Sequence, residues 1–271
     1  MPPHDLVLSS GFLAFARHLG FLDAVEDAMA HGWLEVDGIC GTSSGSLTGA
    51  LWAAGWPARR IADELSLRSP LRWMRVSSTP WRGLFAMGGV VAHLSRLLPA
   101  RIEDLERPFG VGVIDASGAP RVLTEGPLSE AVAASCAMPT VFTPVRIGDA
   151  DWQDGGARDR IGLTGWRAHR GERPTVVHRV MRSAGPASGP LPPDVVTVES
   201  GRSGATFLSL GDLHGQAEES RAEAWRVLRA RFAPPGFGEE EQEARGHGGE
   251  VDHQRVDGDG GAGQEREPGH A

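Results

Sequence analysis

One pentapeptide in this 271-residue sequence has a spacing that suits nucleophilic chemistry. Gly41-Thr42-Ser43-Ser44-Gly45 follows a short apolar run and precedes a stretch of small residues. A serine on a strand-to-helix turn needs a strained backbone, and glycines on both sides relieve the clashes that side chains would cause. The turn also places the hydroxyl at a helix N-terminus, where N–H groups stabilise negative charge. We therefore predict Ser43 as a nucleophile flanked by Gly41 and Gly45; Ser44 lacks such paired glycines.

The segments around this turn alternate between strand and helix patterns. Residues 5–10 and 36–40 read as short apolar strands, residues 16–30 carry apolar side chains at helical spacing, and helices are predicted at 47–54 and 57–67. This alternation favours a parallel α/β sheet with helices on both faces.

Further elements are predicted along the rest of the chain. They are a hairpin of residues 109–115 and 121–124, a helix at 128–137, a strand at 145–147, an Asp- and Gly-rich loop at 149–156, strands at 175–180, 195–199 and 206–210, and a charged helix at 218–232.

Three blocks of sequence resemble the patatin-like phospholipase family and occur in the family's order: Leu6–Glu26, Asp37–Gly55 and Ala134–Gly156. The second contains the serine turn, and the third is similar to the family's Ala-Ser-x-Ala-x-Pro segment and the Asp-Gly-Gly motif after it. The resemblance implies a three-layer α/β/α fold with a mainly parallel central sheet and a cap segment around residues 68–101. It also implies a serine acyl hydrolase that cleaves lipid or fatty-acyl esters without a cofactor.

The resemblance further implies a Ser–Asp dyad. Ser43 matches the nucleophile, and Asp154, followed by Gly155 and Gly156, matches the catalytic aspartate. Asp154 would accept the serine proton directly, which requires that burial raise its pKa or that proton transfer be concerted with attack. On the residues alone, an Asp-Gly-Gly sequence is more typical of a hairpin turn, so the assignment of Asp154 depends on the resemblance.

The first loop departs from the family's pattern of three glycines followed by a basic residue. The stretch Ser10–Ala14 keeps only Gly11, and Ala14 stands where the basic residue is expected. An oxyanion hole needs backbone N–H groups rather than particular side chains, so we predict the N–H groups of Gly11, Phe12 and Ser44 as its donors. The departure also favours an alternative, a catalytically weak lipid-binding pseudoenzyme.

A second alternative adds a histidine to the dyad. His214 follows a predicted strand, and the chain order Ser43, Asp154, His214 is that of a conventional α/β-hydrolase triad. A histidine in a loop without catalytic duty explains the same residue. Replacing His214 with alanine distinguishes the two interpretations, because a triad would lose nearly all turnover and a dyad would lose little.

The segment 68–101 is cationic and aromatic in an acidic chain. No acidic residue occurs between Glu64 and Glu103, whereas six arginines and two tryptophans do. Tryptophan and arginine among apolar residues suit the headgroup region of a bilayer. We predict a cap over the site that contacts a membrane; packing of the tryptophans into the core is the alternative.

Composition separates a body from a tail. Residues 238–271 hold ten acidic residues against three arginines, a formal charge of −7, which leaves about −1 for residues 1–237. We predict an acyl hydrolase domain at 1–237 and a disordered acidic, Gly-rich tail at 238–271. A nearly neutral body gives no general attraction for nucleic acid. The sequence Asp257–Gly260 lacks most of a calcium-loop pattern, so no metal site is predicted.

The remaining expectations concern cysteine and location. Cys40 and Cys136 stand in apolar stretches and are predicted as small buried residues rather than a disulfide. No apolar run approaches the length of a bilayer span, and the N-terminus lacks a signal-peptide pattern. The sequence therefore predicts a cytoplasmic protein that is soluble or peripheral at a membrane.

Overall fold

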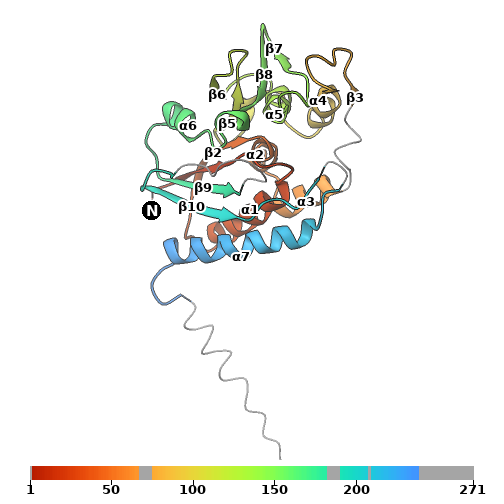
Figure 1. Ribbon diagram of the computed structural model, residues 1–271. Coiled ribbons are helices and arrows are strands. Elements are labelled where there is room, and N and C mark those ends of the chain that lie inside the picture. Colours follow the sequence, from red (N-terminus) through yellow and green to blue (C-terminus); the bar gives the residue numbers. More distant parts are fainter. Residues whose placement is uncertain (1, 67–74, 182–189, 207–208, 238–271) are drawn as a thin grey trace, which may run out of the picture. The chain divides into compact units, whose positions relative to one another are not determined.

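The fold is built on a central sheet. Among the residues that the computed structural model describes (2–66, 75–181, 190–206 and 209–237), the sheet has eight strands in the order β10-β9-β1-β2-β5-β8-β7, with β6 also paired to β5 (Figure 1). The strands are β1 His4–Leu8, β2 Val36–Thr42, β5 Phe109–Ile114, β6 Pro120–Leu123, β7 Val145–Ile147, β8 Ala150–Asp154, β9 Thr175–Val180 and β10 Val195–Ser200. The five from β10 to β5 run parallel, and β6, β7 and β8 pair antiparallel. The predicted mainly parallel sheet is confirmed.

Helices cover both faces of this sheet, as the apolar β1 and β2 sequences require. They are α1 Phe15–Ala30, α2 Ser44–Ala53, α3 Ala58–Ser66, α4 Gly88–Leu94, α5 Leu128–Ser135, α6 Leu163–Arg170 and α7 Leu213–Phe232. A short hairpin, β3 Arg75–Val76 with β4 Phe85–Ala86, lies apart from the central sheet.

The alternation of side chains along β1 and β2 separates the two outer layers. Leu8 and Ile39 lie beside α2 at Gly49, whereas Val7 and Cys40 form a buried cluster with residues of α6. Because successive side chains of a strand point to opposite faces, α2 and α6 cover opposite faces of the sheet. The three-layer α/β/α fold is therefore confirmed.

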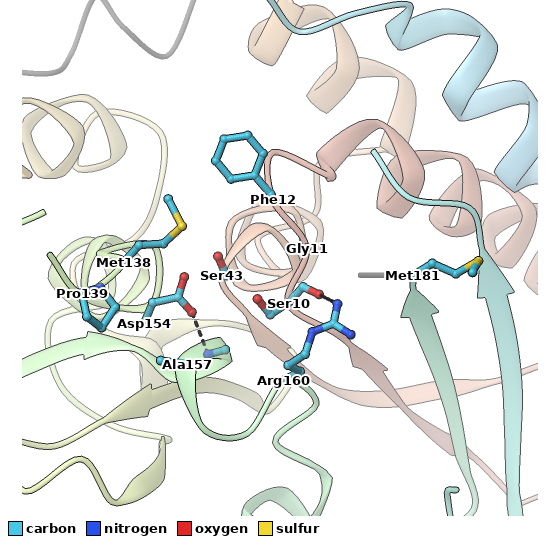
Figure 2. A pocket seen from close by; sticks show the side chains of 11 residues that line it. Ser10, Gly11, Phe12, Ser43, Met138, Pro139, Asp154, Ala157, Arg160 and Met181 are labelled. Carbon is cyan, nitrogen blue, oxygen red and sulfur yellow. Dashed lines mark hydrogen bonds between the residues drawn. The ribbon is translucent and has the colours of Figure 1, made fainter. Parts of the chain in front are cut away.

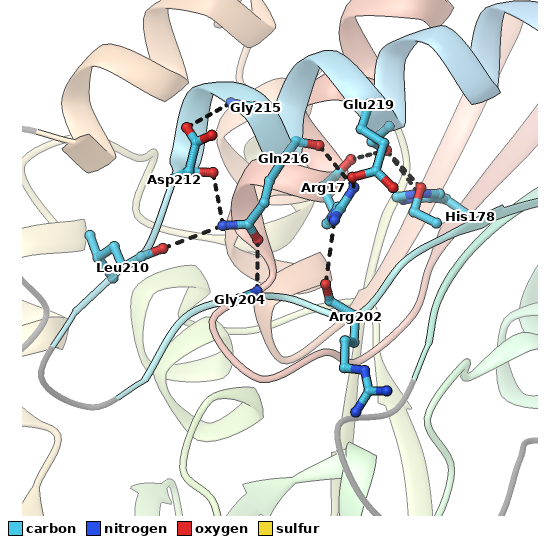
Figure 3. Close-up of polar contacts among 11 residues, drawn as sticks. Arg17, His178, Arg202, Gly204, Leu210, Asp212, Gly215, Gln216 and Glu219 are labelled. Atoms are coloured by element: carbon cyan, nitrogen blue, oxygen red, sulfur yellow. Dashed lines mark hydrogen bonds and ion pairs between the residues drawn. The ribbon is translucent and has the colours of Figure 1, made fainter.

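Helices α1 and α7 pack side by side although they lie far apart in the sequence (Figure 1). A Cβ atom on Gly20 of α1 would lie 2.0 Å from the carbonyl oxygen of Ala217, so only glycine permits this close approach. Arg17 adds polar contacts to α7, an ion pair of 2.7 Å with Glu219 and a hydrogen bond of 3.3 Å to the Gln216 carbonyl (Figure 3). These contacts hold the helix that follows the first loop.

Two predicted elements differ from the structure. The loop predicted at 149–156 contains strand β8, which pairs with β5 and β7 and ends at Asp154. The polar sequence of β8 shows no apolar strand pattern, because this strand is defined by its backbone pairing rather than by burial of apolar side chains. The strand predicted at 206–210 is wrong for its described residues, since Thr206, Ser209 and Leu210 belong to no strand and the Thr206 N–H donates to the Ser209 carbonyl at 2.6 Å.

The C-terminal part of the chain forms a separate unit from Pro234 onward, and the elements above belong to the unit Met1–Ala233. Residues 238–271, including Asp257–Gly260, lie outside the described residues, so the predicted domain boundary stays a prediction. No helix within the described ranges is long and apolar enough to cross a bilayer.

Candidate active site

Ser43 occupies the turn between β2 and α2. Its backbone has φ 56° and ψ −121°, a conformation that costs on the order of 1–3 kcal/mol for a non-glycine residue. The flanking glycines make the turn possible. A Cβ atom on Gly41 would lie 2.3 Å from the Gly45 carbonyl oxygen, and one on Gly45 would lie 2.5 Å from that of Leu8. The steric reason given for the spacing of these glycines therefore holds.

Helix α5 fixes the strained turn from the side. The Ser43 N–H donates to Ser135 Oγ at 2.8 Å, and the Ser135 hydroxyl donates to the Gly112 carbonyl of β5 at 2.6 Å. The Cys136 thiol donates to the Ser43 carbonyl at 3.4 Å. Sequence reasoning gave no role to Ser135 and treated Cys136 as an inert apolar residue. Both are supports of the serine turn.

Asp154 lies at the end of β8 with 3% of its surface exposed. Burial raises its pKa to about 6, while hydrogen bonds from the Ser43 hydroxyl and the Gly156 N–H act in the opposite direction. The Gly156 N–H donates to Asp154 Oδ1 at 2.7 Å. The structure thus brings Ser43 and Asp154 together, and their side chains face one another in Figure 2.

The two glycines after Asp154 allow close packing of the turn. A Cβ atom on Gly155 would lie 2.7 Å from the backbone carbonyl group of Gly112, and one on Gly156 would lie 2.2 Å from Ser10 Oγ. Larger residues at either position would push the Asp154 turn away from β5 or from the first loop. The Asp-Gly-Gly sequence is therefore a packing requirement of this site.

The predicted oxyanion residues fall into two groups. Gly11 and Phe12 belong to the loop after β1 and line the same pocket as Ser43 and Asp154 (Figure 2). Leu13, next in this loop, has φ 46°, which bulky residues rarely adopt. Ser44 is the first residue of α2, and its buried side chain is not part of the pocket lining. Only its backbone N–H can serve the site.

The pocket has a volume of about 380 Å³ and a mixed lining. Apolar side chains come from Phe12, Met138, Pro139 and Met181, and the cation Arg160 reaches the pocket from the loop after the Asp154 turn (Figure 2). Met138, Arg160 and Met181 were not predicted as residues of the site. Their segments are ordinary in composition, and only the fold brings them to Ser43.

His214 does not join this site. It is exposed near the start of α7 and lines a different hollow, between α1, α3 and α7, together with Gly20, Asp23 and Arg59. None of the described residues that line the Ser43 pocket is a histidine. The triad alternative is therefore wrong in its third member, because helix α7 carries the imidazole to another part of the molecule.

The segment 68–101 is described from residue 75 onward. Its hairpin is joined through the backbone to the segment that follows the pocket residue Pro139, where the Phe85 N–H donates to the Val141 carbonyl at 3.0 Å and the Thr143 N–H donates to the Phe85 carbonyl at 2.8 Å. No residue of 75–101 lines the pocket. Within the described ranges, no group of three or more metal-binding side chains forms a metal site.

The fold is that of an α/β protein whose pocket pairs a serine on a strained strand-to-helix turn with a buried carboxylate. Residues 6–165 match the patatin-like phospholipase family, and the chain belongs to that family. Uncharacterised NTE family proteins of Mycobacterium tuberculosis and Mycobacterium bovis are 29% identical to it over 165 residues.

These matches cover 60% of this chain and 45% of each relative, so the chain spans about half the length of the curated relatives it matches. The crystal structure of VipD from Legionella pneumophila is similar in fold, with a TM-score of 0.52 and 13% identity over 84% of this chain and 67% of that one.

Proposed function

We propose that the protein is a lipid acyl hydrolase of the phospholipase A or esterase type, with Ser43 as nucleophile and Asp154 as its base. The observation that carries this proposal is the contact between the Ser43 hydroxyl and the buried Asp154 carboxylate inside a pocket. Membership of the patatin-like phospholipase family supports a lipid substrate. The apolar side chains of Phe12, Met138 and Met181 suit an acyl chain.

The proposed reaction has two steps. Asp154 takes the hydroxyl proton as Ser43 Oγ attacks the ester carbonyl, and the protonated Asp154 then returns that proton to the leaving alcohol. The acyl-enzyme is hydrolysed by water that Asp154 activates in the same way. Because burial places the pKa of Asp154 at about 6, the carboxylate is ionised at neutral pH and is a stronger base than an exposed aspartate. No cofactor or metal takes part in this scheme.

The negative charge of the tetrahedral intermediate needs N–H donors. We propose the backbone N–H groups of Gly11, Phe12 and Ser44, the first two because they line the pocket and the third because it opens helix α2. Helix N-termini favour negative charge through their unpaired N–H groups.

The proposal is tested with a fluorophosphonate probe and an ester panel, from short nitrophenyl esters to phospholipid vesicles. We expect labelling at Ser43 and hydrolysis by the wild-type protein, and loss of both in Ser43→Ala. Ser44→Ala, one position along the same turn, is the matched control and keeps labelling. A folded wild-type protein that does not react with the probe would instead support the alternative, a lipid-binding pseudoenzyme whose first loop no longer stabilises an oxyanion.

We also propose that the segment 68–101 contacts a lipid surface through its hairpin. Val76, Trp81 and Leu84 are 82%, 80% and 55% exposed, which is unusual for large apolar side chains. Arg82, by contrast, is paired with Asp151 at 2.5 Å. The apolar side chains, rather than this arginine, are therefore proposed to enter the interface.

Flotation with phosphatidylcholine vesicles and with vesicles that contain phosphatidylglycerol tests this contact. Trp81→Ser with Leu84→Ser is expected to weaken binding about tenfold or more to both, since each buried apolar side chain contributes about 1.5–3 kcal/mol. Arg82→Gln is expected to have a small effect. Hydrolysis of a short soluble ester should be unchanged in all variants. Unaltered vesicle binding by the double variant would exclude the hairpin as the contact. The cytoplasmic location and the lack of nucleic-acid partners stay predictions.

A further inference from the structure

The loop that carries the proposed oxyanion donors has no basic residue of its own. Ala14, where the sequence comparison led us to expect one, is completely buried. The cation at this place comes instead from Arg160, four residues beyond Gly156. Its side chain reaches the pocket from below the loop and ends beside Ser10 (Figure 2).

Arg160 holds Ser10 at two points. Its Nη2 donates to the Ser10 carbonyl at 2.6 Å, and its own carbonyl accepts the Ser10 N–H at 2.6 Å. The same Nη2 donates to the Val180 carbonyl at 3.0 Å, at the end of β9. One side chain thus connects the first loop, the segment after Asp154 and the end of a neighbouring strand.

The bond to the Ser10 carbonyl has a direct consequence for Gly11. The Ser10 carbonyl and the Gly11 N–H belong to one planar peptide group, and in a trans peptide they point in opposite directions. A guanidinium on the carbonyl side therefore fixes the N–H on the other side. In Figure 2, Ser43 and Arg160 lie on opposite sides of Ser10, which is the arrangement that an N–H directed to the serine side requires.

The bond also acts electronically. Hydrogen bonds from a charged donor are roughly twice as strong as neutral ones, and a polarised carbonyl makes the N–H of its own peptide a better donor. Arg160 thus supplies orientation and polarisation without touching the reacting atoms.

We propose that Arg160 is a positioning residue that orients and polarises the Ser10–Gly11 peptide so that the Gly11 N–H stabilises the oxyanion. This inference rests on the proposed hydrolase function. It explains how a first loop with a single glycine, Gly11, can still present a fixed donor. The loop's rigidity comes from a side chain outside the loop rather than from its own sequence.

Three substitutions test this role. Arg160→Met removes both the charge and the donor, Arg160→Gln keeps a neutral donor, and Arg160→Lys keeps the charge. Loss of an oxyanion donor lowers kcat by about 10²- to 10³-fold in other hydrolases, so we expect a fall of about 10²-fold in Arg160→Met. We expect KM to change less than threefold, Arg160→Gln to be intermediate, and Arg160→Lys to recover at least a tenth of wild-type kcat. Arg158→Gln, an exposed arginine on the same segment, is the matched control and stays at wild-type activity.

The measurements are kcat and KM for a soluble nitrophenyl butyrate and the rate of fluorophosphonate labelling at Ser43, with thermal unfolding of each variant. Wild-type kcat in folded Arg160→Met would overturn the proposal. Equal losses in Arg160→Lys and Arg160→Met, matched by equal loss of folded protein, would also overturn it, because a structural role alone predicts that result. A wild-type protein that neither labels nor hydrolyses would overturn the hydrolase function and this inference together, whereas a labelled wild type with equally fast Arg160→Met would overturn only the latter.

Discussion

Two groups of buried titratable side chains in this protein differ in their access to solvent. Asp154 is almost fully buried, yet it lines the pocket next to Ser43. His18 and His178 are both fully buried, and their Nδ1 atoms lie 2.9 Å apart. His178 Nε2 is 2.8 Å from Ser200 Oγ, and neither histidine belongs to the lining of the Ser43 pocket. Asp154 thus meets a pocket, whereas His178 faces α7, where Ser220 Oγ lies 3.5 Å from its Nε2 (Figure 3).

Burial acts on both groups in the same way, because it favours the neutral form. It raises the pKa of Asp154 to about 6, lowers that of His18 to about 3 and lowers that of His178 well below its usual range. A shifted pKa therefore reports burial and does not by itself indicate a reactive group. The pocket and the neighbouring hydroxyl are what distinguish Asp154.

The largest effect on activity is expected when Asp154, the titratable residue that lines the pocket, loses its charge. Asp154→Asn keeps the shape and can still accept the Gly156 N–H, but it cannot take a proton from Ser43. We expect kcat to fall by about 10³- to 10⁴-fold, as for other hydrolytic centres that lose an acidic member. Steady-state hydrolysis of a short ester measures this, and Asp151→Asn, on the same strand but outside the pocket lining, is the control. Activity within tenfold of wild type in Asp154→Asn would remove Asp154 from the mechanism.

The same substitution should stabilise the protein. The folded pKa of about 6 lies above the ordinary value of 3.8, so the ionised carboxylate costs stability once the pH rises through 6. The difference corresponds to about 3 kcal/mol at pH 8, a cost that a neutral amide avoids. Urea denaturation at pH 8 and pH 4 should show Asp154→Asn more stable than wild type at the higher pH only. A destabilised variant at pH 8 would contradict the burial of an ionised carboxylate.

The pH dependence of turnover gives a second contrast between the two groups. A base with a pKa of about 6 is protonated below that pH, so kcat/KM should fall about tenfold for each pH unit below 6. The histidines should leave no mark on this profile, because they stay neutral in the folded protein and lie outside the pocket. A profile that instead breaks at a pH set by His18 or His178 would show that the histidine pair takes part in turnover.

The histidine pair should control stability in acid. The pKa of both histidines is lowered in the folded protein. Their contribution to the stability of the fold is therefore present above pH 6.5, the pKa of an unfolded histidine, and is lost as the pH falls below 6.5. Each histidine that stays neutral in the folded state should remove about 2–3 kcal/mol between pH 6.5 and 4.5. Urea denaturation of the wild type and of His18→Gln with His178→Gln at both pH values measures this.

The double variant loses hydrogen bonds at every pH, so its absolute stability does not test the prediction. The test is how much the free energy of unfolding changes between pH 6.5 and pH 4.5 in each protein. Around the pair lie Ser200, Ser220 and Arg17, which the substitutions leave in place. The expected result is a smaller change in stability between the two pH values, and His169→Gln, exposed on α6, should retain the wild-type slope. Equal slopes in all three proteins would contradict the neutral buried pair.

The sequence predicted the fold and half of the site for identifiable reasons. Gly41, Ser43 and Gly45 form a local pattern whose steric logic is the same in any strand-to-helix turn, so no long-range information was needed. Asp154 required the resemblance to a family, because the proximity of two residues more than a hundred positions apart is set by the order of strands in the sheet. Strand β8, which carries it, is polar and gave no apolar signal.

The missing half of the site consists of contacts that only the fold creates. Ser135 supports Ser43 across 92 positions, and Arg160 reaches Ser10 across 150. Ser135 stands in the Ala-Ser-x-Ala-x-Pro segment, but that motif does not reveal its contact with Ser43, and Arg160 stands in no motif. Both side chains act on backbone groups of their partners. Sequence motifs point to the proposed reacting residues, whereas the contacts that hold the backbone around them are set by the fold.

The smallest effect is expected from His214, the residue that chain order alone made a candidate. It is exposed on α7 and lines a hollow with Asp23 and Arg59 rather than the Ser43 pocket. His214→Ala should therefore leave kcat/KM for a short ester within about twofold of wild type, since exposed substitutions away from a site rarely change stability by more than about 0.5 kcal/mol. A triad would lose about 10³-fold or more. A loss of that size would mean that α7 moves far enough during turnover to bring His214 to Ser43, and a triad would then replace the proposed dyad. An unchanged rate in His214→Ala, together with the large loss of kcat in Asp154→Asn, would support the Asp154 carboxylate as the base.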